Sequence, residues 1–258
     1  MVKGEATEVR ESRREYGSTQ EPVPPGYKRT EVGVIPEEWE VLILSELVAI
    51  RTGPFGSALH RADYVDGGTP LINPRNIRDD LLVPDDSISV SESAAHRLAD
   101  YRLEVGDVLI ARRGDIGRSA VITESEKGWI CGTGCMVLRP NALVDARFLR
   151  RVFASRRVVG RIIASAVGST MVNLNHSALA TVSIQLPPLP EQRAIARALS
   201  DLDDLISALD KLIEKKRAIK QATMQQLLTG RTRLPGFGGG WEQVCAGEIG
   251  TFRGGNGF

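Results

Sequence analysis

The chain has 258 residues, of which 42% are hydrophobic and 25% charged, and its formal net charge is +1. This length suits one large domain or two modest ones, and the composition is that of a globular protein with a real core. The near-neutral charge excludes a strongly basic protein that coats DNA regardless of sequence. No apolar run is long enough for a transmembrane helix, so no membrane partner is expected.

The first residues differ in composition from the rest of the chain. Residues 1–26 mix charged side chains with Gly, Ser and Pro and have almost no apolar periodicity, which predicts a disordered segment. They contain no apolar stretch like the core of a signal peptide. We therefore expect a cytoplasmic protein.

The cysteines and histidines give no sign of a metal site. There are three of each, and their spacing matches no common ligand pattern. In a reducing cytosol, unpaired and buried thiols are the expected state of Cys131, Cys135 and Cys245.

Residues 27–186 alternate short β-like runs with turn signals, which predicts an α+β domain. The runs 107–112 and 118–123 predict two strands joined by a turn with two glycines. A third strand is expected over 135–139 and a last one over 182–186.

The same domain is expected to contain helices near its C-terminal end. Apolar residues recur at helical spacing between 145 and 167, which predicts one amphipathic helix over 145–167. Asn175 is a predicted N-cap of a short helical turn.

Residues 187–230 are predicted to form one long helix. Pro190 suits the first turn of a helix, and Thr229-Gly230 suits its end. At ~1.5 Å per residue the helix would be roughly 60 Å long. Its apolar stripe takes three positions per heptad and therefore needs a partner surface. The residues expected to pair with another helix or to dock a partner are Ile195, Leu199, Leu202, Leu205, Ile206, Leu209, Leu212, Ile213 and Ile219.

The charges of this helix favour one direction of pairing. Acidic residues lie in its first half (Asp201, Asp203, Asp204 and Asp210), and basic residues in its second (Lys211, Lys215, Lys216, Arg217 and Lys220). An antiparallel coiled coil places opposite charges together, whereas a parallel one opposes like charges. Compensation of the helix dipole also explains this distribution, and that alternative stays open.

Residues 231–258 resemble an earlier stretch of the chain. Trp241-Glu242 repeats Trp39-Glu40 at an offset of 202 residues, and Glu248 matches Glu46 at the same offset. A period near this length is too long for a solenoid repeat. It predicts duplication of a whole module, of which residues 231–258 are the truncated second copy.

Several segments resemble the specificity subunits of Type I restriction–modification systems. The stretch 186–195 (LPPLPEQRAI), with 225–231 (QQLLTGR), resembles the spacer helix of that family. GVIPEEWE at 33–40 resembles its module-opening segment. Segments 103–112 and 168–175 resemble landmarks of its recognition domain.

This resemblance, over roughly residues 27–258, implies a DNA-binding subunit with no catalysis of its own. It implies two target-recognition domains, held apart by antiparallel helices, that each read half of a split double-stranded DNA site. A Type I methyltransferase (M) subunit would dock on the helices, and a restriction (R) subunit would complete the complex. S-adenosylmethionine, and ATP with Mg²⁺ for restriction, are then expected in the partner subunits and no cofactor in this one. Because only one recognition domain, 27–186, is complete, a homodimer through the long helix is also expected.

The turn at 112–118 is a candidate DNA contact. Arg112, Arg113 and Arg118 bracket its two glycines, where backbone can approach a phosphate and a guanidinium can reach a guanine edge. Asp115 could accept a hydrogen bond from cytosine or orient an arginine. An ordinary hairpin with solvated charges is the alternative.

Two further segments offer groups that suit base edges. Asn73, Arg75 and Asn76 form a turn with two amides and a guanidinium, although Asn and Pro are also common turn formers. Hydroxyl and amide groups that could contact DNA are also present at Ser169, Thr170 and Asn173.

Two other functions fit the sequence less well. A stand-alone DNA methyltransferase needs a glycine-rich cofactor loop and an Asn/Asp-Pro-Pro-aromatic motif, and the nearest strings, 73–75 and 187–189, do not fit. A structural coiled-coil adaptor without DNA reading does not require the β-rich domain at 27–186.

Overall fold

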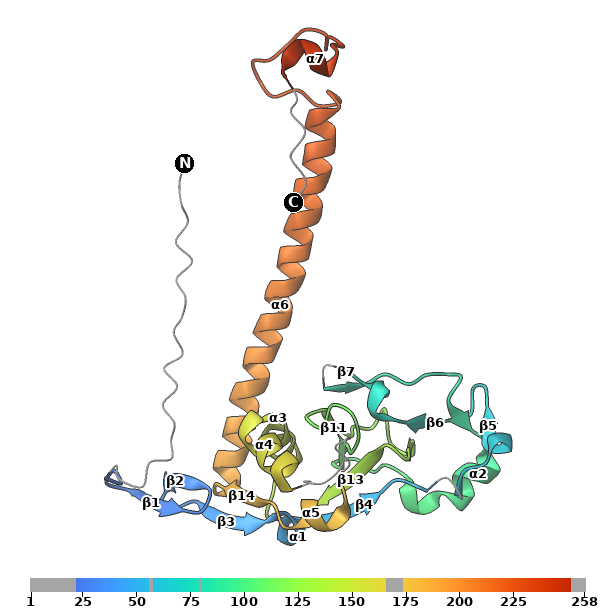
Figure 1. Ribbon diagram of the computed structural model, residues 1–258, viewed down its shortest axis with the longest axis vertical. Helices are drawn as coiled ribbons and strands as arrows, with labels where there is room; N and C mark the ends of the chain where they lie inside the picture. Colours follow the sequence, from blue (N-terminus) through green and yellow to red (C-terminus); the bar gives the residue numbers. More distant parts are fainter. Residues whose placement is uncertain (1–21, 56–57, 79, 166–173, 252–258) are drawn as a thin grey trace. The chain divides into compact units, whose positions relative to one another are not determined.

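The computed structural model describes residues 22–55, 58–78, 80–165 and 174–251 (Figure 1). The chain divides into two compact units, Met1–Ala198 and Leu199–Phe258. The first unit holds the sheets and the short helices that precede one long helix. This arrangement confirms the α+β class and the long helix. Of the expected disordered segment, residues 1–21 lie outside the described residues.

A four-stranded antiparallel sheet lies at the centre of the first unit, in the order β11-β10-β13-β4. Ile110 of β10 pairs with Ser119 of β11, and Ala111 pairs with Cys135 of β13. The three strands predicted between residues 107 and 139 are therefore confirmed, and β4 adds the second edge. The strands are β4 (Val48–Thr52), β10 (Val108–Ala111), β11 (Ser119–Val121) and β13 (Cys135–Pro140).

A second sheet of short strands has the order β12-β6-β9-β5. Cys131 of β12 and Cys135 of β13 are both buried in one apolar cluster, so the two sheets share part of their core. Cys245 is exposed, so the expectation of a buried thiol is wrong there. The strands are β5 (Tyr64–Val65), β6 (Thr69–Ile72), β9 (Ser89–Val90) and β12 (Ile130–Cys131).

Strand pairs and short helices complete the first unit. The predicted strand over 182–186 is confirmed as β14, which pairs with β3 near the start of the described chain. The pairs are β1 (Tyr27–Thr30) with β2 (Gly33–Pro36), β3 (Glu40–Ile43) with β14 (Ser183–Leu186), and β7 (Ile77–Arg78) with β8 (Leu81–Leu82). The short helices are α1 (Leu44–Leu47), α2 (Glu92–Arg97) and the 3-10 turns Arg61–Asp63, Pro74–Asn76 and Ala99–Tyr101.

The single helix expected over 145–167 is wrong. The structure has two helices, α3 (Ala146–Ala154) and α4 (Arg156–Ser165). Ser155 separates them in an extended conformation, with φ −72° and ψ 124°.

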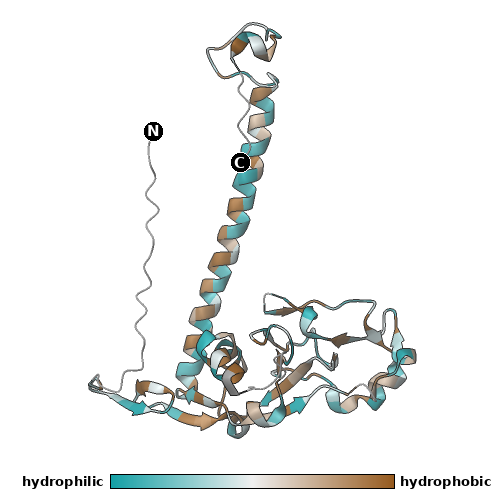
Figure 2. Cartoon of the chain, in the orientation of Figure 1, coloured by the Kyte–Doolittle hydropathy of each residue, from teal (hydrophilic) through white to brown (hydrophobic). Residues whose placement is uncertain are grey.

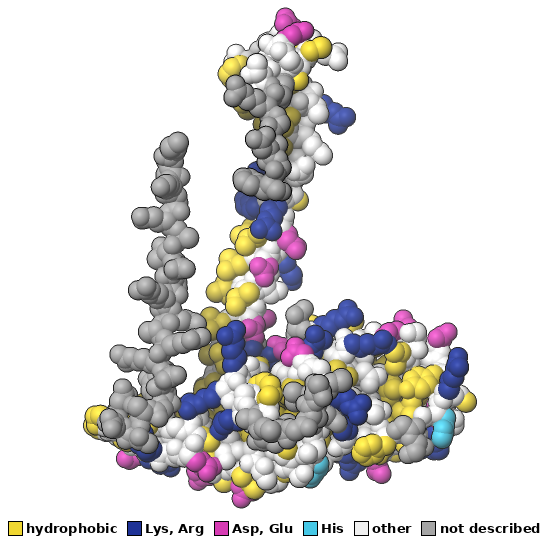
Figure 3. Space-filling view, viewed as in Figure 1, with side chains coloured by type: hydrophobic (Ala, Val, Ile, Leu, Met, Phe, Trp, Pro, Cys, Tyr) yellow, Lys and Arg dark blue, Asp and Glu magenta, His cyan; other side chains and the backbone are white. Residues whose placement is uncertain are grey.

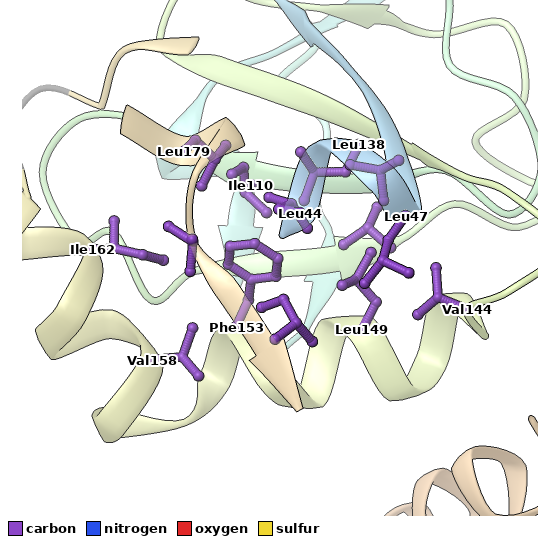
Figure 4. Packing of buried hydrophobic residues seen from close by; sticks show 14 of the residues in the cluster. Leu44, Leu47, Ile110, Leu138, Val144, Leu149, Phe153, Val158, Ile162 and Leu179 are labelled. Atoms are coloured by element: carbon purple, nitrogen blue, oxygen red, sulfur yellow. The ribbon is translucent and has the colours of Figure 1, made fainter. Parts of the chain in front are cut away.

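Burial explains this break. Phe153 is fully buried at the end of α3. In one continuous helix, Arg156 and Arg157 would follow three and four residues later on the same buried face. The break instead places Val158 and Ile162 in the core, where Figure 4 shows them on the same side as Phe153.

The main core lies between α3, α4 and the central sheet. Figure 4 shows Phe153 and Leu149 of α3 facing Ile110 and Leu138 of the sheet, with Leu44 of α1 beside them. Each such side chain contributes about 1.5–3 kcal/mol on full burial. The helices are therefore held firmly against β10 and β13, and this fixes the turn that follows β10.

A short helix confirms the predicted cap at Asn175. Its side-chain Oδ1 accepts a hydrogen bond from the backbone N–H of Ala178 at 2.7 Å. The helix that follows is α5 (His176–Ala180).

The long helix α6 (Leu189–Leu228) begins inside the first unit. Gln192 is fully buried, and its Nε2 donates to the carbonyls of Pro187 and Leu143 at 2.8 and 3.0 Å. Its Oε1 accepts from the backbone N–H of Asp145 at 2.9 Å. One amide thus ties the first turn of α6 to the residues that precede α3.

The rest of α6 is exposed in this single chain, and its alternating apolar and polar surface is visible in Figure 2. Ile195 packs against the core, whereas the other stripe residues expose between 38% (Leu199) and 58% (Ile206) of their surface. The expected helix end is confirmed, because Gly230 adopts a φ of 70° that favours glycine. Among the residues described, none of the helices is both long and apolar enough to cross a bilayer.

The residues after α6 repeat an element of the first unit. The helix α7 (Ala246–Ile249) lies at the same offset of 202 residues from α1 (Leu44–Leu47) as the sequence repeat. The counterpart of β3 is not a strand among the described residues, and it has no paired strand like β14 there. The duplication of a whole module stays a prediction from the sequence.

Candidate nucleic-acid interface

The turn at 112–118 joins β10 to β11 as the sequence predicts. Arg113 is exposed, and among the described residues it forms no ion pair. Arg118 Nε lies 3.2 Å from Asp115 Oδ2, so this carboxylate orients the guanidinium. Gly114 has a φ of 74°, a backbone conformation that favours glycine. The turn therefore presents two exposed arginines, and in the described part of the chain Arg118 is oriented by a carboxylate whereas Arg113 is not.

Arg112 has a different position in the same turn. It is only 7% exposed, and this burial, followed by the charge of Arg113, lowers the pKa of its guanidinium. Its backbone N–H donates to the carbonyl of Gly134 at 3.0 Å, and its own carbonyl accepts from the N–H of Leu174 at 2.9 Å. Arg112 thus connects three segments of the domain.

The turn at 73–76 is a 3-10 turn with a buried amide. Asn76 is 3% exposed, and its side chain accepts from the Asn73 N–H and donates to the Val83 carbonyl. The amide oxygen and the amide nitrogen of Asn76, which were predicted to contact a base edge, are therefore used to hold the turn. Arg75 is exposed and pairs with Asp85 at 3.0 Å.

The turns at 73–76 and 112–118 both contact the loop at 132–134. A Cβ on Gly132 would lie 2.5 Å from Asn73 Oδ1, and one on Gly134 would lie 2.6 Å from Pro74 Cδ. Only glycine fits such close contacts. Because Gly134 also accepts from Arg112, the loop at 132–134 joins both predicted turns, which are far apart in the sequence.

The third group of predicted contacts, Ser169, Thr170 and Asn173, lies outside the described residues. Leu174, which follows them, is fully buried and bonded to Arg112. Leu174 therefore lies beside the turn at 112–118.

A cavity of about 570 Å³ adjoins the same turn. Arg78 of β7 lines it together with Arg118 and Ser119, and neither Arg78 nor Ser119 was predicted as a contact. Arg78 could have been predicted as a DNA contact from the sequence, because it is basic and lies two positions after the turn at 73–76. The lining residues are Ile77, Arg78, Asp80, Asp115, Gly117, Arg118, Ser119 and Ala154.

An ion pair between a surface turn and a buried helix position fixes one wall of this cavity. Asp80 follows β7 with a φ of 66°, which is unusual for a residue other than glycine. Its carboxylate pairs with Arg150 of α3, a guanidinium that is only 9% exposed. The hairpin of β7 and β8 is therefore tied to α3. On the face shown in Figure 3, Lys and Arg side chains gather over β7 and over α3 and α4.

Comparison with known proteins identifies the family. The sequence profile described as "Type I restriction modification DNA specificity domain" matches residues 36–221, which include both turns, the cavity and most of α6. The chain belongs to this specificity family. The resemblance inferred from the sequence is therefore confirmed, and the family is one of DNA-recognition subunits rather than of the catalytic subunits of these systems.

Relatives of this specificity family have a similar sequence and fold. A protein of Methanocaldococcus jannaschii, assigned as the MjaX specificity subunit of a type I restriction enzyme, is 31% identical over 79% of this chain and 48% of its own length. The fold resembles the HsdS subunit of Thermoanaerobacter tengcongensis, with a TM-score of 0.54, 24% identity and coverage of 78% and 47% of the two chains. A chain from a study of type I restriction–modification complex assembly gives a TM-score of 0.59 at 22% identity, over 74% and 46%. The chain spans about half the length of these relatives.

Proposed function

We propose that this chain is a sequence-specific DNA-recognition subunit that directs the methyltransferase and restriction subunits of a Type I system to a split DNA site. The observation that carries the proposal is the family match, because it extends through the globular domain and along most of α6. The recognition domain reads DNA, and the helix provides the surface for assembly. S-adenosylmethionine, ATP and Mg²⁺ act in the partner subunits.

The contacts around the turn at 112–118 support a role in DNA reading. Arg113 is free to reach a phosphate or a guanine edge, and Arg118 is held by Asp115 in one orientation. A guanidinium held by a carboxylate loses less freedom on binding than a mobile one. Base contacts come from Arg113 and Arg118, while Arg112 and Asn76 position the turns.

The exposed stripe of α6 supports assembly through this helix. Leu202, Leu205 and Ile206 each expose more than half of their surface, which is costly in water. A second copy of α6, placed antiparallel, covers this stripe and sets Asp201 and Asp204 near Lys215 or Lys216 of its mate. Such a pair has two-fold symmetry. The DNA site is then two identical, inverted half-sites that flank unread base pairs.

Selection from a random duplex library tests the DNA-reading proposal. The purified full chain, alone and with its methyltransferase subunit, is incubated with the library, and the retained duplexes are sequenced. The proposal expects enrichment of one split motif that the methyltransferase subunit alone does not enrich. Retention without any sequence preference would instead support an adaptor that does not read DNA.

A further inference from the structure

The cavity between the β7–β8 hairpin and β11 contains a buried hydroxyl that has no hydrogen-bond partner in the described part of the chain. Ser119 is 1% exposed, and its Oγ forms no hydrogen bond to any described residue. Burial of a polar group without a hydrogen bond is unfavourable, so such a group calls for an explanation. Because Ser119 lines the cavity, a ligand bound there can accept a hydrogen bond from this hydroxyl.

The charges around the cavity favour an anion. Arg78 is exposed on one wall, and within the described part of the chain it forms no ion pair; its Nε donates only to the Arg75 carbonyl, at 3.3 Å. Arg118 stands on the other wall. The two acids of the lining are already paired, Asp115 with Arg118 and Asp80 with Arg150. One positive charge is therefore in excess.

The volume also suits such a ligand. The cavity is open to solvent, and its volume of about 570 Å³ exceeds what one phosphate group needs. A guanidinium and a hydroxyl are common donors to phosphate oxygens in protein–DNA contacts.

We infer that this cavity binds a backbone phosphate of the bound DNA duplex, held by Arg78 and the Ser119 hydroxyl beside Arg118. The inference rests on the proposed function, since it assigns a second contact of the same interface. The phosphate fixes the register of the domain on the duplex while the turn at 112–118 reads bases. Arg150 is a positioning residue, because through Asp80 it holds the hairpin that carries Arg78.

The test uses the full chain with fluorescent duplexes that carry its selected motif, titrated at several salt concentrations. Arg78→Gln is expected to weaken binding evenly across sequences and to reduce the slope of log K against log salt by about 0.9. Ser119→Ala is expected to weaken binding about tenfold, as the loss of a hydrogen bond to a charged group does. Arg61→Gln, an exposed arginine outside the cavity, is the control and leaves both quantities unchanged.

Thermal unfolding separates this role from a structural one. Because the Ser119 hydroxyl has no hydrogen-bond partner among the described residues, Ser119→Ala should keep or raise the melting temperature while it weakens DNA binding. A lower melting temperature with unchanged DNA affinity would overturn the site. So would a changed preference at one base pair in Arg78→Gln with the salt slope intact. If the wild-type chain selects no motif, the proposed function fails instead.

Discussion

Arg150 of α3 forms an ion pair with Asp80, the residue that precedes β8 in the hairpin of β7 and β8. The arginine is 9% exposed and the aspartate 45%, so the pair joins a buried helix position to a surface turn. It connects the packing of α3 to the position of Arg78, although the partners are 70 residues apart in the sequence.

Removal of the Asp80 carboxylate alone should lower the free energy of unfolding more than removal of both Asp80 and Arg150. Asp80→Asn removes the carboxylate that pairs with the buried guanidinium of Arg150, and because Asp80 is partly exposed we expect a loss of about 1–2 kcal/mol in the free energy of unfolding, below that of a fully buried pair. Arg150→Met/Asp80→Asn should lose less, since no buried charge remains. Urea unfolding measures both, with Arg147→Met on the exposed face of α3 as control. Equal losses in the single and double variants would contradict a specific pair.

Arg113 should contribute directly to recognition. Its guanidinium is exposed, so Arg113→Ala should leave the unfolding curve unchanged. If it reads a base, the variant loses about 1–3 kcal/mol of binding energy and relaxes specificity at one position of the selected motif. If it contacts phosphate, binding falls evenly with a smaller salt slope. If Arg113→Ala shows neither change, the turn is an ordinary hairpin with solvated charges.

Charge reversal on α6 tests its antiparallel pairing. The variant Asp201→Lys/Asp203→Lys/Asp204→Lys should have a higher dissociation constant of the dimer, since the new lysines would face Lys215, Lys216 and Arg217 of the other copy. Adding Lys215→Glu, Lys216→Glu and Arg217→Glu to this variant should partly restore the dimer. Sedimentation at several concentrations measures the dimer, and low salt enlarges the effect. A chain that stays monomeric at every concentration would refute self-pairing.

Thiol labelling checks the packing of the core. Burial raises the pKa of Cys131 and of Cys135 far above the usual range, so both stay protonated at neutral pH and react slowly. Cys245 is exposed and should react at once with an aromatic disulfide reagent. One equivalent of the aromatic thiolate should therefore be released quickly from the native protein, and three equivalents from the unfolded protein. Fast reaction in native Cys245→Ser would show that the buried pair is accessible.

The sequence was informative where local patterns decide the structure. The strands β10, β11, β13 and β14 alternate or cluster apolar residues in the expected way, and the end of α6 just before Gly230 follows from the backbone conformation that glycine favours. The break at Ser155 was missed because the spacing of apolar residues on both sides looks helical. Only the need to keep Arg156 and Arg157 out of the core reveals it.

The candidate site was less accessible to sequence reasoning. The turns at 112–118 and 73–76 were recognisable by their glycines, amides and arginines. Their connection through Gly132 and Gly134 depends on contacts between distant segments, and so does the ion pair of Asp80 with Arg150. For the same reason, the buried state of Asn76 could not be inferred from its residue type.

Mapping of methylated bases in cells that express this chain with its methyltransferase subunit tests the central claim most directly. The account predicts one split motif that disappears when the chain is deleted. Self-pairing through α6 further predicts that its two halves are identical and inverted. A methylation pattern that does not depend on the chain would contradict the assignment of DNA specificity to it, and two different half-sites would contradict the homodimer alone.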